Sequence, residues 1–137
     1  MIEDWKKEER IGIYGNNGPC VIVLHGGPGA YGGSDPVAKE LSKSFRTFSP
    51  WQRRSGSIKL SVDVHIEDLR ELLETKLPNE KPAIVGESWG AMLALAFAAK
   101  YPNMSKCLVL VGCGTYTEEA RNELTKTRLQ RIRNHIS

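Results

Sequence analysis

The sequence predicts an α/β fold, a mostly parallel β-sheet with helices on both faces. Short apolar runs alternate with longer segments of helical periodicity along the chain. The run at residues 20–24 is continuously apolar, which is typical of a strand that is buried on both faces of a parallel sheet. A serine between two glycines, in GESWG, follows one such run and opens an alanine- and leucine-rich helix.

Length and composition fit one soluble globular domain, or part of one. The chain has 137 residues, of which 40% are hydrophobic and 26% charged, and its net charge is +3. The basic residues are scattered, so we expect neither a nucleic-acid nor a membrane partner. No apolar run nears the ~18 residues of a membrane span, and the N-terminus has no signal-peptide pattern. A cytoplasmic location is therefore expected.

The cysteines and histidines do not indicate a metal or cofactor site. Cys20, Cys107 and Cys113 lie in apolar runs and are expected to be small core residues in a reducing compartment. The chain has three histidines and no Cys/His pair at a zinc-type spacing. We expect no bound metal and no cofactor.

Five segments are predicted to be strands. The first is a short edge strand at residues 9–14, and turn residues end it. The other four are buried runs, at residues 20–24, 45–51, 81–85 and 106–111.

Helices are predicted between these strands. Ser34 or Asp35 can cap the first, with Pro36 at its first position, and it runs to about Lys43. Ser61 can cap the second. The second helix has one apolar stripe, made of Ile66, Leu69, Leu72, Leu73 and Leu77.

The last two helices differ sharply in character. Residues 88–101 are apolar almost all round, so this helix should be buried on more than one side. From Thr115, which fits a capping box with Glu118, the chain is polar, helical and increasingly basic. We therefore divide the chain into a core, residues 1–114, and a helical tail, residues 115–137.

The first motif is Gly86-x-Ser88-x-Gly90, between a buried strand and a helix. This context is that of a nucleophile elbow, a tight turn that presents a serine hydroxyl for attack on a carbonyl. The helix N-terminus supplies a positive partial charge beside Ser88. The alternative is a serine that only caps a buried helix.

The second motif is His25-Gly26-Gly27-Pro28-Gly29, directly after a buried strand. Acyl transfer develops negative charge on a carbonyl oxygen, and backbone N–H groups can stabilise it. In an elbow enzyme one N–H comes from the residue after the serine, here Trp89. The other comes from the loop after an earlier strand, here Gly27. His25 is expected to hold the loop by hydrogen bonding, and not to act as the base.

The same loop also matches a dinucleotide-binding pattern. Residues 27–32 fit G-x-G-x-x-G after a strand. However, Pro28, Gly32 and Gly33 delay the helix to about Pro36, and no acid ends the next strand. This alternative also leaves the serine elbow unexplained.

Together these motifs make the sequence resemble the α/β-hydrolase superfamily, and most nearly its proline iminopeptidase-like group. The resemblance rests on residues 25–29, on the loop at 52–57, and on residues 86–90 with the helix that follows. It covers the chain from about Ile11 to Thr115. It implies Ser88 as nucleophile and the N–H groups of Gly27 and Trp89 as the oxyanion hole. Residues 51–54 read WQRR where the group has Asp-Gln-Arg-Gly, and Glu87 stands where the iminopeptidases have glycine.

The residues after Ser88 offer no credible base. In this fold the triad runs serine, acid, histidine along the chain. After Ser88 there are three glutamates, no aspartate and one histidine, His135, near the end of the basic tail. His65 precedes the serine and is expected to be a partly exposed helix residue.

The resemblance accounts for this absence. Hydrolases of the group are longer, and continue into a helical cap and then into strands that carry the acid and histidine. The segment from Thr115 resembles the first helix of that cap. We therefore interpret the chain as the N-terminal half of a hydrolase: a partial α/β-hydrolase fold without the C-terminal strands and most of the cap.

Two main functional hypotheses follow. The first is a serine hydrolase acting on an ester or on an amide or peptide through an acyl-enzyme, with the acid and histidine supplied from elsewhere. The second is a catalytically silent fragment or interaction module. In either case residues 107–111 would form an exposed sheet edge, which invites self-association or a complementing chain.

Overall fold

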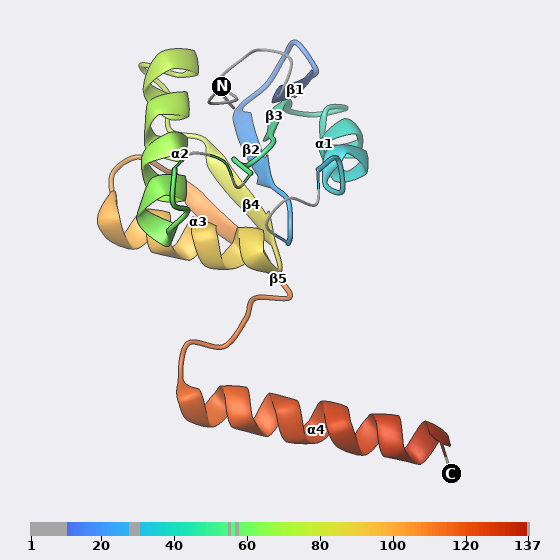
Figure 1. Ribbon diagram of the computed structural model, residues 1–137. Helices are drawn as coiled ribbons and strands as arrows, with labels where there is room; N and C mark the ends of the chain where they lie inside the picture. The colour runs from blue at the N-terminus through green and yellow to red at the C-terminus, as the bar shows by residue number, and fades with distance from the viewer. Residues whose placement is uncertain (1–10, 28–30, 55, 57, 137) are drawn as a thin grey trace.

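The predicted fold class is confirmed by the computed structural model, which describes residues 11–27, 31–54, 56 and 58–136 (Figure 1). Its five strands form one sheet in the order β1-β3-β2-β4-β5. Only β1 is antiparallel to its neighbour, and the other pairings are parallel. The strands are β1 Ile11–Tyr14, β2 Cys20–Leu24, β3 Arg46–Pro50, β4 Ala83–Glu87 and β5 Cys107–Val111. The helices are α1 Asp35–Leu41, α2 Val62–Lys76, α3 Trp89–Lys100 and α4 Glu118–Ile136.

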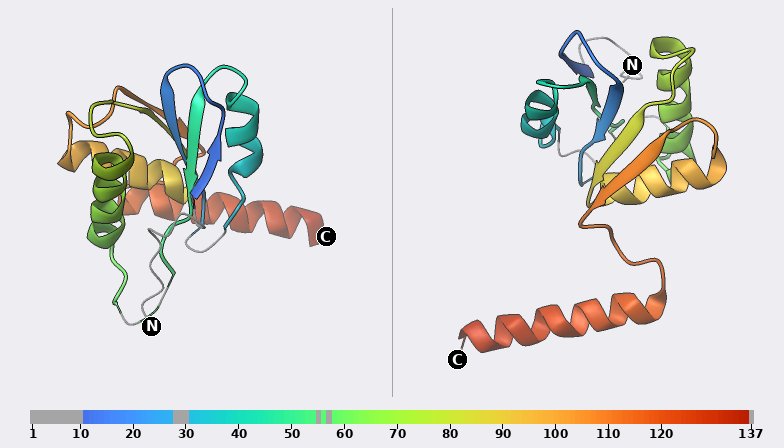
Figure 2. Two further views of the ribbon diagram at one scale, coloured as in Figure 1. Left: turned by 90° about the horizontal axis from the view of Figure 1, so that it is seen from above. Right: turned by 180° about the vertical axis from the view of Figure 1, so that it is seen from behind.

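The sheet is the middle of three layers. Successive side chains of a strand point to opposite faces, and the buried strand β2 therefore serves two cores. Ile22 and Leu24 pack with α2 and α3, whereas Val21 and Val23 pack with Ala38 of α1. Figures 1 and 2 show α1 on one face of the sheet and α2 and α3 on the other. Helices on both faces explain why the strand reads as a continuous apolar run.

The second helix, α2, follows the sequence prediction closely. The Ser61 hydroxyl accepts the Val64 N–H at 3.2 Å and so caps the helix. All five residues of the predicted apolar stripe are buried against the sheet and α3. Each such leucine or isoleucine contributes about 1.5–3 kcal/mol by leaving water.

The start of α1 differs from the prediction in one respect. Ser34 occupies the cap position and Pro36 lies in the first turn, but the Ser34 hydroxyl makes no capping bond. It is buried and has no hydrogen-bond partner in the described structure. Asp35 instead accepts a hydrogen bond from Ser49 of β3, at 2.9 Å, so the helix start is tied to the sheet.

β4 lies two residues later than the sequence predicted, at Ala83–Glu87 in place of residues 81–85. Pro82 has no N–H to donate to a ladder, which explains the later start. Glu87 pairs with Val111 of β5, which extends the strand to the residue before Ser88. The elbow therefore begins directly at the end of a paired strand.

β5 forms one edge of the sheet and is largely exposed. Val109 is 48% and Val111 is 52% exposed. The expectation that all three cysteines are core residues is wrong for two of them: Cys20 is buried, but Cys107 and Cys113 are exposed. Cys107 is exposed because β5 has a neighbour on one side only among the described residues, and Cys113 lies beyond the end of that strand.

The tail is helical as predicted, but its cap was misplaced. The helix begins at Glu118, and the Thr117 hydroxyl, not that of Thr115, accepts the Ala120 N–H at 3.2 Å. α4 stands away from the sheet (Figures 1 and 2), and its described side chains are exposed. In the part of the chain that the structure describes, every helix is too short or too polar to cross a membrane.

Candidate active site

Ser88 lies in a sharp turn between β4 and α3, with φ of 53° and ψ of −116°. Among the described residues it is the one non-glycine residue with a positive φ. L-residues adopt this conformation only at a cost of about 1–3 kcal/mol. Its side chain is exposed and makes no capping bond to α3, so its hydroxyl does not play the alternative role of helix cap.

Close backbone packing on both sides of Ser88 requires glycine. A Cβ on Gly86 would overlap the carbonyl oxygen of Gly90, and a Cβ on Gly90 would overlap that of Leu24. α3 therefore begins directly against the end of β2. The Ser88 N–H donates to Val111 O at 2.8 Å, which ties the turn to β5 as well.

The glycine loop after β2 lies beside this serine. A Cβ on Gly26 would come within 3.1 Å of the Ser88 Cβ, and Gly27 has a φ of 55°, in the left-handed region. The structure thus brings Gly26, Gly27, Ser88 and the start of α3 together. Pro28 and Gly29, the other predicted support residues of this loop, lie outside the described residues.

His25 is buried at the root of the loop, only 1% exposed. Its Nε2 accepts the Gln52 backbone N–H at 3.0 Å, and its Nδ1 lies 2.9 Å from Gly26 O. The proton is therefore on Nδ1, since Nε2 accepts and Gly26 O can only accept. Burial lowers the His25 pKa, so the ring is neutral at pH 7. Both nitrogens are engaged in holding the loop.

Gln52 connects this loop to the residue after the serine. Its Nε2 donates to His25 O at 2.9 Å, and its Oε1 accepts the Trp89 indole N–H at 2.6 Å. The Trp89 ring also meets the His65 ring edge-on, with centroids 5.9 Å apart. The expectation of a partly exposed His65 is wrong: it is buried, and burial lowers its pKa.

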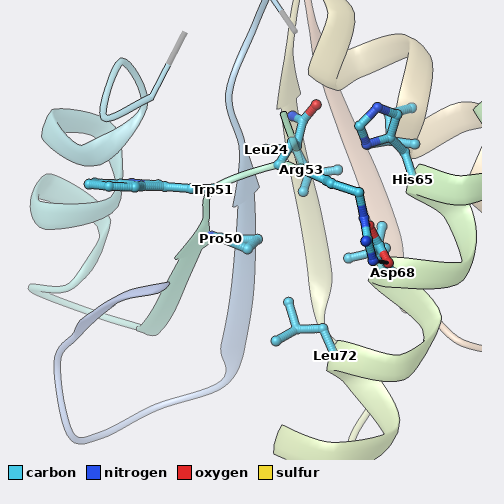
Figure 3. Close-up of a pocket in the computed structure, with 10 residues that line it drawn as sticks. Leu24, Pro50, Trp51, Arg53, His65, Asp68 and Leu72 are labelled. Carbon is cyan, nitrogen blue, oxygen red and sulfur yellow. Dashed lines mark hydrogen bonds and ion pairs between the residues drawn. The ribbon is translucent and has the colours of Figure 1, made fainter. Parts of the chain in front are cut away.

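A buried ion pair fixes the segment after β3. Arg53 donates two hydrogen bonds to Asp68 of α2, at 2.7 and 2.8 Å, and both side chains are only about one-eighth exposed, 13% and 12%. Figure 3 shows the Arg53 side chain reaching Asp68, while the Trp51 ring points the other way. The cavity between them, about 20 Å³, has room for roughly one water molecule.

The described structure holds no base for Ser88. No described side chain hydrogen-bonds to its hydroxyl. His25 uses both ring nitrogens in the loop, and His65 faces Trp89. His135 belongs to α4, which stands away from the sheet.

Among the described residues, no three Cys, His, Asp or Glu side chains lie together as a group that could hold a metal ion. The dinucleotide alternative required a helix that opens within the glycines. α1 instead begins at Asp35, after the glycine run.

Three features of this site had escaped the sequence reasoning: the Gln52 bridge, the Arg53–Asp68 pair and the burial of His65. One signal was that Gln52 and Arg53 belong to the loop that carried the family resemblance. Asp68 also lies beside Ile66 and Leu69 of the apolar stripe, a position that calls for a buried partner.

Comparison with known proteins identifies the superfamily. The model of the alpha/beta hydrolase fold family matches residues 19–135. A 2-hydroxy-6-oxo-2,4-heptadienoate hydrolase of Pseudomonas putida F1 is 32% identical over 113 residues, covering 77% of this chain and 41% of that protein. A Mycoplasma genitalium protein named "Putative proline iminopeptidase" is 33% identical over 100 residues, 64% of this chain and 30% of that protein.

A solved structure shows the same fold. The meta-cleavage product hydrolase of Pseudomonas fluorescens IP01 superposes with a TM-score of 0.68 at 30% identity, covering 79% of this chain and 43% of that one. The chain thus spans less than half the length of each of these three proteins. Because the family model covers most of the sequence and a solved hydrolase structure superposes on the chain, this chain belongs to the α/β-hydrolase superfamily.

Proposed function

We propose that the chain carries the nucleophile and oxyanion hole of a serine hydrolase. The observation that supports this most strongly is Ser88 itself, an exposed serine held at positive φ between a strand end and a helix N-terminus. The fold gains no capping bond from this strain. Backbone strain that stabilises no other part of the fold is typical of functional positions.

In the proposed reaction Ser88 Oγ attacks a substrate carbonyl and passes its proton to a base. The carbonyl oxygen becomes an oxyanion, which the N–H groups of Gly27 and Trp89 stabilise. Trp89 is the first residue of α3, so its N–H has no partner within the helix. The intermediate collapses to an acyl-enzyme and releases an alcohol or amine, which takes the proton. Water then attacks the acyl carbonyl and passes a proton to the base, the carboxylic acid product leaves, and the base returns the proton to Ser88 Oγ.

The substrate class is an ester, or an amide or peptide. The support is the family membership together with the glycine loop and the elbow. The relatives named above as hydrolases and as an iminopeptidase carry different specificities, so the assignment goes no further than this carbonyl chemistry.

The same proposal places the catalytic acid and histidine outside these 137 residues. They would come from polypeptide that packs along the exposed edge of β5, either a further segment of the protein or a complementing chain. The C-terminal end of β5 is adjacent to the site, since Val111 O accepts the Ser88 N–H. A strand paired there would carry its own C-terminal loop to Ser88.

Covalent labelling tests the nucleophile. In a sample that holds the complementing polypeptide, a fluorophosphonate should add once per chain: Ser88 Oγ bonds to phosphorus, fluoride leaves, and the base takes the proton. Ser88→Ala should abolish the adduct in intact-mass spectra, and Ser42→Ala is the matched control, since Ser42 only bonds Lys39 O on α1. Without a base the rate should fall by about a million-fold relative to a complete triad.

Two results would oppose the proposal. Labelling that persists in Ser88→Ala would place the nucleophile elsewhere. No labelling even in a sample that holds the complementing polypeptide would support the alternative of a catalytically silent module.

A further inference from the structure

We propose that Gln52 is a positioning residue that sets the spacing of the two oxyanion donors. It ties the His25–Gly27 loop, which carries one donor, to Trp89, which carries the other. This inference rests on the proposed function because it concerns the same site.

The bridge consists of three hydrogen bonds from one residue. The Gln52 backbone N–H donates to His25 Nε2, and its side-chain Nε2 donates to His25 O. Its side-chain Oε1 accepts the Trp89 indole N–H. A primary amide offers a donor and an acceptor on one planar group, so it can face a carbonyl and an indole N–H together. These two partners also fix which way the amide points.

Burial makes the bridge stiff. Gln52 is 6% exposed, so little water competes for its hydrogen bonds. Losing the side chain would leave the His25 carbonyl and the Trp89 indole N–H without their partner.

Gln52 is itself held from the far side. The next residue, Arg53, makes the bidentate ion pair with Asp68 of α2. The segment after β3 is thus anchored to α2, and Gln52 reaches from this anchor to both halves of the site.

The oxyanion hole needs such an anchor because of what its donors are. Gly27 has no side chain to hold it, and its φ of 55° is one of several that glycine adopts freely. Oxyanion donors work at 2.7–3.1 Å, and a misplacement of about 1 Å can cost roughly 100-fold in rate. A link from the loop to the start of α3 keeps the two N–H groups at a fixed separation.

The first test is kinetic and uses the complemented protein. Gln52→Met keeps the approximate shape and removes the side-chain bonds, and Trp89→Phe keeps an aromatic ring but removes the indole N–H together with the rest of its five-membered ring. Each should lower the maximal rate of fluorophosphonate capture by roughly 10–100-fold, with little change in the reagent's half-saturating concentration. The double variant should be no slower than the slower single one, because both break the same bridge.

The matched control is Gln130→Met on the exposed face of α4, which should leave the rate unchanged. Independent, multiplying losses in the double variant would overturn the inference. So would a change confined to the half-saturating concentration.

The second test does not need catalysis. In ¹H–¹⁵N spectra, Trp89→Phe should shift the Gly27 amide resonance, although the lost indole N–H bonds Gln52 and not Gly27. If the wild-type protein is not labelled by the fluorophosphonate but the Gly27 amide resonance shifts in Trp89→Phe, the proposed function fails and the bridge stands. An unmoved Gly27 amide would overturn the bridge, whatever the labelling shows, even where Gln52→Met fails to fold.

Discussion

At the scale of single residues, the fold sustains a strained conformation at Ser88. The neighbours that enforce it are backbone atoms: Gly90 abuts the Leu24 carbonyl, and the Ser88 N–H is bonded to Val111. None of these contacts depends on the serine hydroxyl. The strain should therefore persist in Ser88→Ala and disappear in Ser88→Gly.

This predicts an unusual order of stability. Glycine normally destabilises a protein relative to alanine, through the entropy of the unfolded chain. At this φ the relief of strain is larger, so Ser88→Gly should have a higher free energy of unfolding than Ser88→Ala by about 1 kcal/mol. Urea denaturation of the two variants measures the difference. Gly56→Ala, where a new Cβ meets nothing within 4 Å, is the control for a position without this constraint. The usual order at position 88 would contradict the argument.

The sequence located the elbow and the glycine loop because each has a local signature. Gly86 and Gly90 are needed by their own turn, and Ser88 lies between them. Gln52 has no such signature: its partners, His25 and Trp89, are 27 and 37 residues away in the chain. A bridge between distant residues follows from tertiary packing, which a single sequence does not display.

At the scale of elements, two histidines are buried at the ends of secondary structure. His25 follows β2, and His65 lies in the first turns of α2. Burial is the largest cause that lowers the pKa of each. Asp35 opposes the shift at His25, and Asp68 opposes it at His65, where Arg53 and His25 reinforce it.

Stability should therefore fall between about pH 7 and pH 5. Below the unfolded pKa of about 6.5, the unfolded chain binds protons that the folded chain does not, which favours unfolding. Each histidine contributes up to about 1.4 kcal/mol per pH unit until the pH drops below its folded pKa. Urea midpoints across this range measure the slope. His65→Phe keeps an aromatic ring against Trp89 but cannot titrate, so it should flatten the curve. An unchanged slope in that variant would remove His65 from the account.

Some element boundaries are set by contacts with other elements and not by the local sequence pattern. The α2 stripe was predictable because a helix that packs on one face shows it in its own sequence. β4 was placed two residues early: Pro82 delays its start, and its end is set by the pairing of Glu87 with Val111 of β5. The cap of α4 moved to Thr117, because the preceding residue, Tyr116, is bonded through its hydroxyl to Met92 O of α3 and the helix begins only after that contact.

At the scale of the whole molecule, the two edges of the sheet differ in character. β1 is a short antiparallel strand with a glycine and a tyrosine among its four residues. β5 is five apolar residues, CLVLV, without charge or proline. Natural edge strands usually carry a charged residue or a proline, which prevents pairing with other chains. β5 therefore has the character of an interior strand placed at an edge.

We expect the 137-residue chain on its own to self-associate through β5. Sedimentation velocity over a concentration series should show growing assemblies. Val109→Lys should suppress them, because a charge on an edge strand opposes pairing with a second copy. Ile13→Lys, a similarly exposed position on the opposite edge, should leave association unchanged. A wild-type chain that stays monomeric throughout the series would show that β5 is not adhesive. Equal suppression by both substitutions would instead assign the effect to net charge. If Val109→Lys alone suppresses association, the same variant should also slow the labelling of Ser88 in the complemented protein. The reason is that the edge that binds a second copy is also the edge proposed to receive the catalytic acid and histidine.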